Sequence, residues 1–422
     1  MSVARAILVV ALVSIAAAVL LAVVSRTPEA IRLAKPPPDA TDPSLGARFT
    51  DAEIARNGAY RGPAYLSYLL VLVVETVALV AAARAFVPRL VAATESWRGG
   101  WPTQGIVVAL TLSVLLTLVV LPLGYVRFSI DHAWRLANQS TGAWLLDQVR
   151  GLGVGLVMSA IAAIAFLAVV RGFPRAWWAI GWVVFTLLTV VLTFLAPIVI
   201  APLFNRFTPL PDGPLKERVV ALAHDAGVDL DDVLVADASK RSTAENAYVT
   251  GIGASKRMVL YDTLIDAGDD RETAYVAAHE LGHEVHDHIW KGIAVAALGL
   301  LVGFVALRWL ATRPGLWAWG GAAGIHDVRA LPLVALLVGA AGLLSLPLQN
   351  SVSRAFERQA DTTAITLTHD PDTAVRVFRR LAFANYADLR PPRVAVWALF
   401  SHPPIPERIE NALASDRTTT TP

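Results

Sequence analysis

Long apolar segments dominate this chain and restrict it to architectures that place helices in a lipid bilayer. A helix needs around twenty mostly apolar residues to cross the hydrocarbon core. Hydrophobic residues make up 55% of the chain and charged residues only 17%, which is far from the balance of a soluble domain. Seven segments are long enough: Ala6–Val24, Tyr65–Ala83, Gly105–Tyr125, Leu152–Val170, Trp177–Ile200, Gly292–Leu310 and Leu331–Leu348. The sequence therefore predicts a multi-pass α-helical membrane protein.

Two further features bear on the first segment and on its orientation. Its apolar core exceeds the roughly 7–15 residues of a cleavable signal peptide, so we interpret it as a retained span.

Lysine and arginine are spread almost evenly over the short loops, except for an excess between Arg26 and Arg61. Positively charged loops favour the cytoplasm. We therefore expect a cytoplasmic first loop, an outside N-terminus and an inside C-terminus. The net charge of +2 gives no reason to expect a nucleic-acid partner.

The alternation of apolar and polar stretches divides the chain into four parts. Residues 1–200 hold five transmembrane helices with their loops, and residues 289–348 hold the sixth and seventh. The polar stretch 201–288 has an α+β pattern, and residues 349–422 form a polar C-terminal segment. Within the polar stretch we expect a helix at "LKERVVALAHDAG" and strands at "DVLVAD", "NAYVTGIG" and "KRMVLY". A second helix is expected to start near Asp269 and could run on into the sixth span.

Four of the chain's nine histidines fall within "AAHELGHEVHDH", residues 277–288. His279 and His283 are four positions apart, so on a helix both imidazoles project from one face and can bind one cation. Glu280 can address a water molecule at that cation, which completes the H-E-x-x-H pattern of two zinc ligands and a general base. The alternative interpretation is a solvated polar helix end before a membrane span.

A catalytic zinc needs a third protein ligand and keeps one open position. His286 lies on a similar face to His279, but one turn too far along the same helix. The segment "SRAFERQADTTA" offers Glu357 as a ligand instead. Asp361, four residues later, can accept a hydrogen bond from a ligand histidine. Taken alone, this segment would be an ordinary charged helix, but beside an H-E-x-x-H pattern the metal-site interpretation is favoured.

The combination of "HELGH", "ERQAD" and seven spans resembles the type I CAAX prenyl proteases, integral-membrane zinc metallopeptidases of the gluzincin kind. Other segments resemble the family at corresponding places: "YVRFSIDHAWRLANQST", "IAPLFNRFTPLPDGPL", "ENAYVTG" and "SHPPIPERI". The resemblance covers roughly residues 63–409. The alanine-rich, cysteine-free composition suggests a bacterial member.

The resemblance implies a role for particular residues. It implies one zinc ion per chain with ligands His279, His283 and Glu357, a base at Glu280, and support of His279 by Asp361. It further implies that Asn246, Ala247 and Tyr248 belong to an edge strand that pairs with the substrate backbone. It implies that His402 stabilises the oxyanion and that Arg408 lies nearby in the substrate site.

The family fold implied by the resemblance is a ring of seven helices around a water-filled chamber, with an α+β zincin-like catalytic domain on the cytoplasmic side. Glu75 lies at membrane depth, where an ionisable group is costly unless it faces protein or water. We expect it to line the chamber or to pair with another helix. His286 and His288 are expected to be polar residues at the level of the membrane interface.

We therefore predict a zinc endopeptidase in the cell membrane, surrounded by the lipid bilayer. Its substrate would be a peptide or protein, membrane-associated or lipidated. Two alternatives stay open. One is a heat-shock-type membrane quality-control zinc protease, although such relatives have fewer spans. The other is a channel or transporter whose zinc is structural, in which a fourth protein ligand would close the site.

Overall fold

A computed structural model describes residues 2–419 of this protein, and its largest feature is a set of long helices. Among these residues, seven helices have the length and apolar composition needed to cross a membrane. They are α1 (Val3–Val24), α3 (Asp51–Ala81) with its continuation into α4 (Val87–Ala93), α5 (Gly100–Ala133), α6 (Thr141–Gly172), α7 (Trp177–Val199), α11 (His288–Ala311) and α13 (Leu331–Thr368). The prediction of seven spans is confirmed.

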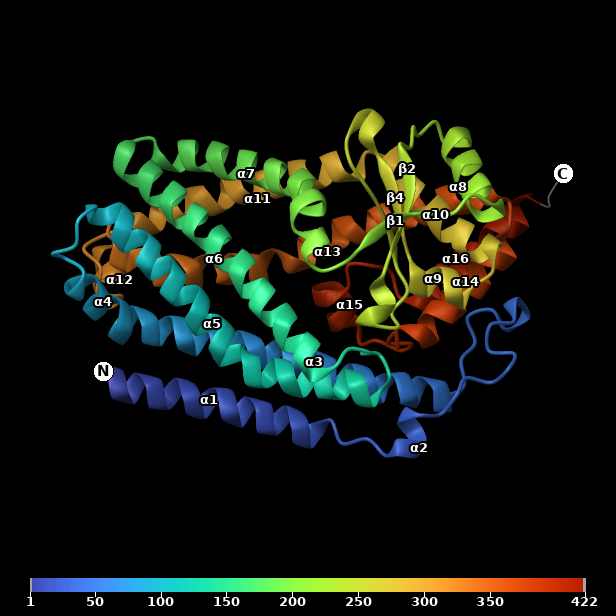
Figure 1. The fold of residues 1–422 in the computed structure, drawn as a ribbon, viewed down its shortest axis with the longest axis horizontal. Helices are drawn as coiled ribbons and strands as arrows, with labels where there is room; N and C mark the ends of the chain where they lie inside the picture. Colours follow the sequence, from blue (N-terminus) through green and yellow to red (C-terminus); the bar gives the residue numbers. More distant parts are fainter. Residues whose placement is uncertain (1, 420–422) are drawn as a thin grey trace.

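Six of these helices form a closed circuit. Each contacts the next in the order α3, α5, α6, α7, α11 and α13, and α13 returns to contact α3. The seventh, α1, packs at the periphery against α3 and α5 (Figure 1). The helices bury few of their residues: α7 buries only Trp177 and Gly181. A helix of a compact bundle would bury a continuous apolar stripe, so this arrangement is more open than a bundle.

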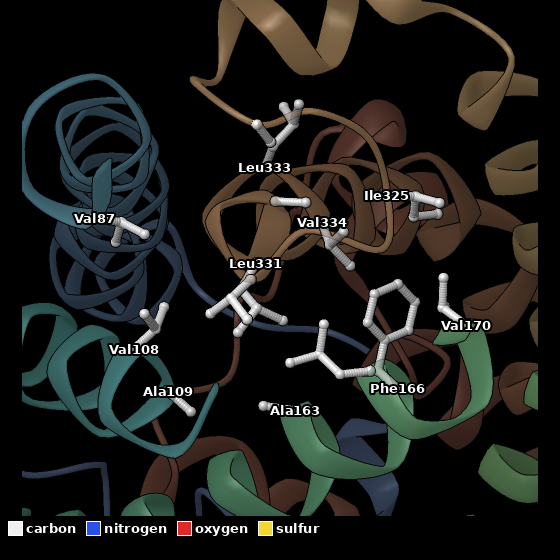
Figure 2. Close-up of a cluster of buried hydrophobic side chains, with 14 of the residues drawn as sticks. Val87, Val108, Ala109, Ala163, Phe166, Val170, Ile325, Leu331, Leu333 and Val334 are labelled. Atoms are coloured by element: carbon white, nitrogen blue, oxygen red, sulfur yellow. The ribbon is translucent and has the colours of Figure 1, made fainter. Parts of the chain in front are cut away.

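One end of the circuit is filled by a hydrophobic core. Val87, Val108, Phe166 and Leu331 contribute to it from four different helices, and Figure 2 shows these side chains converging. Short connecting segments around α12 (Pro314–Trp319) lie at the same end (Figure 1). The strands and the helix that carries the H-E-x-x-H residues lie at the opposite end of the long helices (Figure 1).

The sheet at that opposite end has the strand order β1-β2-β4-β3. Strand β2 (Asp232–Ala236) pairs in parallel with β4 (Arg257–Tyr261), while β1 (Phe207–Pro209) and β3 (Ala247–Thr250) add antiparallel edges. The expected strands therefore form, and the expected helix is α8 (Pro214–Asp225). Gly227 follows that helix with a φ of +68°, the left-handed conformation that glycine accepts without strain.

Helix α10 (Asp270–Val285) carries the H-E-x-x-H residues. Asp269 caps it, because its side chain accepts a hydrogen bond of 2.8 Å from the backbone N–H of Glu272. The helix does not run on into the sixth span as expected. Asp287 takes a left-handed conformation with φ +53°, and α11 starts at His288 in a new direction. Behind α10 lie α14 (Pro371–Ala384) and α16 (Ile405–Thr419), which share a second hydrophobic core with it.

Candidate metal centre

The candidate metal centre lies where α10 and α13 touch. A Cβ placed on Gly282 would lie 2.8 Å from the Cα of Ala360, so the two backbones are in direct contact at this point. Such close approach needs glycine on one helix and a small residue on the other. It brings the histidine face of α10 against the carboxylate face of α13.

The nitrogen and oxygen atoms of three side chains converge at this crossing. His279 Nε2 lies 3.3 Å from His283 Nε2, and Glu357 places Oε2 3.4 Å from His279 Nε2 and Oε1 3.6 Å from His283 Nε2. Donors bound at about 2.0–2.1 Å to a tetrahedral zinc ion lie roughly 3.3 Å from one another. Glu357 Oε2 is also buried without a hydrogen-bond partner among the described residues. The three residues therefore fit a zinc ion.

The two histidines differ in pKa: burial opposes protonation of His279, but Asp361 and Glu357 raise its pKa to about 10, whereas His283 favours the neutral form that a metal ligand needs. Burial lowers its pKa to about 4, and the neighbouring His279 adds to the shift. The imidazole is thus neutral at pH 7, and only the neutral ring can donate a lone pair to a metal.

On the far side of His279 stands a buried pair of charges. Asp361 Oδ1 lies 2.9 Å from His279 Nδ1. Arg408 holds both carboxylate oxygens of Asp361, with Nε 2.8 Å from Oδ2 and Nη2 2.5 Å from Oδ1. The guanidinium also lies over the ring of Phe378, 4.4 Å from its centre. Arg408, expected in the substrate site, is therefore buried behind Asp361, and nothing in this geometry gives it a direct contact with substrate.

Glu280 is half-buried beside the three converging side chains. Burial raises its pKa to about 7, although the neighbouring His279 opposes the shift. A carboxyl group with a pKa near neutrality can both take up and release a proton.

His402 reaches the site from a loop that follows α15 (Arg393–Leu399). Its Nε2 lies 3.3 Å from Glu357 Oε1, and its side chain is 59% exposed. Two buried residues of α13 hold α15 and the first residue of this loop. Arg354 Nη1 donates to the carbonyl oxygens of Val396 at 2.8 Å and of Phe400 at 2.6 Å, and Asn350 donates to that of Ala398 at 2.7 Å.

Sequence reasoning missed Arg354 and Asn350, although a signal was present. Together with Glu357 and Asp361 they recur at intervals of four, three and four residues, which places all of them on one face of a helix. Polar residues at that spacing, directly after an apolar span, indicate a polar face turned towards protein.

The strand expected to bind substrate lies next to α10. Strand β3 pairs with β4 on one side only, and its register sets Ala247 opposite Leu260 and Tyr248 opposite Val259. Asn246 precedes the strand and is exposed. Within the described sheet the other side of β3 is an edge whose backbone groups are available for pairing.

The two remaining histidines of the cluster differ from each other. His286 turns away, with Nε2 3.0 Å from Thr363 Oγ1. His288 lies at the start of the sixth span, and after the break at Asp287 it contacts the site. It is only 5% exposed, and its Nδ1 lies 2.9 Å from His283 Nδ1.

This fold and this site define a membrane-embedded metallopeptidase. Residues 209–416 match the model of peptidase family M48, and residues 44–206 match that of the CAAX prenyl protease N-terminal region, which has five membrane helices. The chain belongs to family M48 and is a membrane zinc metalloprotease of the CAAX prenyl protease type. The channel or transporter alternative is thereby set aside, and the five-helix match favours the CAAX type over the heat-shock type.

Similar proteins come from distant organisms. An uncharacterized metalloprotease of Bacillus subtilis, YhfN, is 34% identical over 71% of this chain and 71% of its own length. A CAAX prenyl protease 1 homolog of Arabidopsis thaliana is 33% identical over 70% of each chain. The crystal structure of Ste24p from S. mikatae has the same fold, with a TM-score of 0.74 and 24% identity over 96% of this chain and 98% of that one.

Proposed function

We propose that this protein binds one zinc ion through His279, His283 and Glu357 and hydrolyses peptide bonds of membrane-associated substrates. The observation that carries this proposal is the set of three donor separations of 3.3, 3.4 and 3.6 Å, which match a tetrahedral ion. When bound there, zinc would polarise the scissile carbonyl group and lower the pKa of a water molecule.

The roles of the protein groups follow from their positions. Glu280 takes a proton from the attacking water as the new C–O bond forms, and delivers it to the amine as the C–N bond breaks. The exposed imidazole of His402 donates a hydrogen bond to the carbonyl oxygen as negative charge develops on it. Asp361 keeps the Nε2 lone pair of His279 directed at the metal, and Arg408 keeps Asp361 ionised and in place.

An extended peptide would add to the free edge of β3. Pairing of this kind reads the backbone, with side-chain pockets on alternate residues. Asn246 and Tyr248 are two residues apart along this edge, so their side chains would lie on one face of the sheet beside the bound segment. The edge lies beside α10, which places a paired peptide next to Glu280.

We infer that the site faces the cytoplasm. The first loop, whose positive charge predicts a cytoplasmic position, is bound to the catalytic part of the chain. Buried Arg379 donates hydrogen bonds to the carbonyl oxygens of Ala40, Gly46 and Arg48 in that loop. The loop and the metal centre therefore share one side of the membrane.

The helix circuit is proposed to enclose a water-filled chamber. This is supported by the closed order of helix contacts and by the shallow burial of α7. Glu75 is half-buried on α3 and makes no hydrogen bond or ion pair with the described residues, which favours its facing the chamber. A chamber that connects the bilayer with the site would suit a lipidated substrate, such as the names of the CAAX prenyl protease relatives indicate for those proteins.

The test compares the cleavage rates of a lipidated and a non-lipidated peptide. Purified protein and the Glu280→Gln variant would each receive a C-terminal peptide with a prenylated cysteine, and the same peptide without the lipid. The proposal is supported if the unmodified protein cleaves the prenylated peptide at least tenfold faster than the peptide without the lipid, and if the Glu280→Gln variant does not cleave it. Equal cleavage of both peptides would contradict a lipidated substrate class. Comparison of membrane peptides in cells with and without Glu280 would then identify natural substrates.

A further inference from the structure

We propose that His288 and Gln359 form a hydrogen-bond relay that fixes the tautomer of His283 and aims its Nε2 at the metal. His288 Nδ1 lies 2.9 Å from His283 Nδ1, and His288 Nε2 lies 2.9 Å from Gln359 Oε1. This inference rests on the proposed function, because it takes His283 as a metal ligand. It makes His288 and Gln359 positioning residues, which act through His283.

The direction of each hydrogen bond follows from the chemistry of the groups. An amide oxygen can only accept, so the N–H of His288 is on Nε2. A neutral imidazole carries one N–H, which leaves His288 Nδ1 as an acceptor. His283 must then donate from its own Nδ1. Its Nε2 consequently keeps a free lone pair, and this atom is the one near His279 Nε2 and Glu357 Oε1.

The ring of His288 is fixed in place by its surroundings. It stacks on Phe356 with ring centres 4.2 Å apart and an angle of 12° between the planes. Phe356 and Gln359 flank Glu357 on α13, while His288 is the first residue of α11. The left-handed Asp287 directs α11 so that its first side chain meets this surface. The relay thus links the start of α11 to the two helices that carry the metal ligands.

The two ligand histidines are supported in different ways. His279 faces the carboxylate of Asp361, which is itself paired with Arg408. His283 faces a neutral ring and a neutral amide. A carboxylate partner makes a ligand imidazole more basic, whereas a neutral acceptor mainly sets its orientation. The structure therefore assigns one ligand an electrostatic support and the other an orienting support.

The first test replaces His288 in the full-length protein and measures zinc affinity by competition with a chromophoric chelator. His288→Phe keeps the stacking on Phe356 but removes the acceptor, so affinity should fall about 10–100-fold. His288→Asn places an oxygen near the position of Nδ1 and should restore most of that loss. The visible spectrum of the Co²⁺-substituted protein should shift in His288→Phe and return towards that of the parent in His288→Asn. Exposed His224, replaced by Phe, is the matched control.

The second test uses Gln359 to reverse the relay. Gln359→Glu keeps an acceptor and should retain zinc affinity. Gln359→Leu removes it and should weaken binding. Gln359→Lys offers a donor to Nε2 of His288, which places the His288 proton on Nδ1 and forces His283 to carry its own proton on Nε2. This variant should therefore bind zinc more weakly than Gln359→Leu. Gln349→Leu, on the exposed face of the same helix, is the control.

Three outcomes separate the relay from the ligand assignment. If His288→Phe and Gln359→Lys bind zinc like the parent while His283→Ala does not, the relay is wrong and the ligand assignment stands. If His283→Ala binds zinc normally, the ligand assignment fails and the relay with it. Weak binding in His288→Phe with recovery in His288→Asn supports both.

Discussion

Gly282 of α10 and Ala360 of α13 meet backbone to backbone, with a hypothetical Cβ on Gly282 only 2.8 Å from the Ala360 Cα. The metal centre depends on this contact, because it sets the distance between the histidines of one helix and the carboxylates of the other.

Gly282→Ala should therefore separate the two helices. The backbone of Ala360 cannot rotate away as a side chain could, and overpacking of this kind costs about 1–3 kcal/mol. We expect a lower melting temperature and weaker zinc binding. Gly292→Ala is the control, since no atom lies within 4 Å of a Cβ at that position of α11. A Gly282→Ala protein with the parent's zinc affinity would show that the crossing tolerates a methyl group.

Glu280→Gln should keep zinc and lose peptidase activity. The amide cannot accept the proton of the attacking water, and general base catalysis is typically worth 10²–10⁴-fold. Metal content by elemental analysis and peptide turnover would be measured on the same preparation. Turnover near the parent rate would exclude Glu280 as the base.

The residues of "ERQAD" should differ in their effect on the metal. Glu357→Ala removes one of three protein ligands and should abolish tight zinc binding, as should His279→Ala. Asp361→Ala leaves the His279 ring free to rotate and should cost about 10–100-fold, and Asp361→Asn less. Zinc titration against a competing chelator ranks these variants. Loss of binding in Asp361→Ala with intact binding in Glu357→Ala would mean that the two roles are reversed.

Arg354→Met should release the loop that carries His402 while leaving the zinc ligands in place. Three hydrogen bonds from Arg354 and Asn350 now tie α15 and the first residue of that loop, Phe400, to α13. We expect a fall in kcat approaching that of His402→Ala, with zinc content unchanged. Arg358→Met is the control, because Arg358 makes an exposed ion pair with Glu407 that contributes little to stability. Equal kcat in both arginine variants would count against this role.

Orientation can be read by labelling single cysteines, because the chain has no native cysteine. Ser255→Cys lies near β4 and Arg98→Cys between α4 and α5, and both positions are exposed. A membrane-impermeant reagent added to intact cells should label position 98 and not position 255. A reporter fused after Ala414 should likewise be found in the cytoplasm. Labelling of position 255 from outside would show that the orientation is opposite to the predicted one.

The spans could be predicted, and so could the placement of His279 and His283 on one face of α10, because both follow from local patterns. A run of apolar residues predicts a span, and a pair of histidines four residues apart predicts a shared helix face, from a few turns of sequence alone. The support of the site is different. Arg354 and Asn350 donate hydrogen bonds to backbone carbonyl groups. Every residue has such a group, so the residue types of the partners do not reveal these contacts.

His288 shows a second limit. Its role depends on the left-handed conformation of Asp287, a single-residue break that composition and periodicity do not reveal. A continuous helix from α10 into α11 would have turned His288 away from His283. The apolar span expected at Leu331–Leu348 and the helical face expected at Glu357 and Asp361 belong to one helix, α13, which apolar content alone does not reveal because its last twenty residues are largely polar.

That length has a mechanical consequence. Helix α13 begins in the hydrophobic core at the far end of the circuit and runs without interruption to Glu357 and Asp361. At 1.5 Å per residue, Glu357 lies about 39 Å from Leu331, so a tilt of only 1° pivoting there displaces the carboxylate by about 0.7 Å. Pro347 lies between the two, at a point where a helix bends more easily. A bilayer that is thicker or thinner than the helix changes its tilt. Because Glu357 is a proposed zinc ligand, a tilt of α13 about its first turn would move it relative to the histidines of α10.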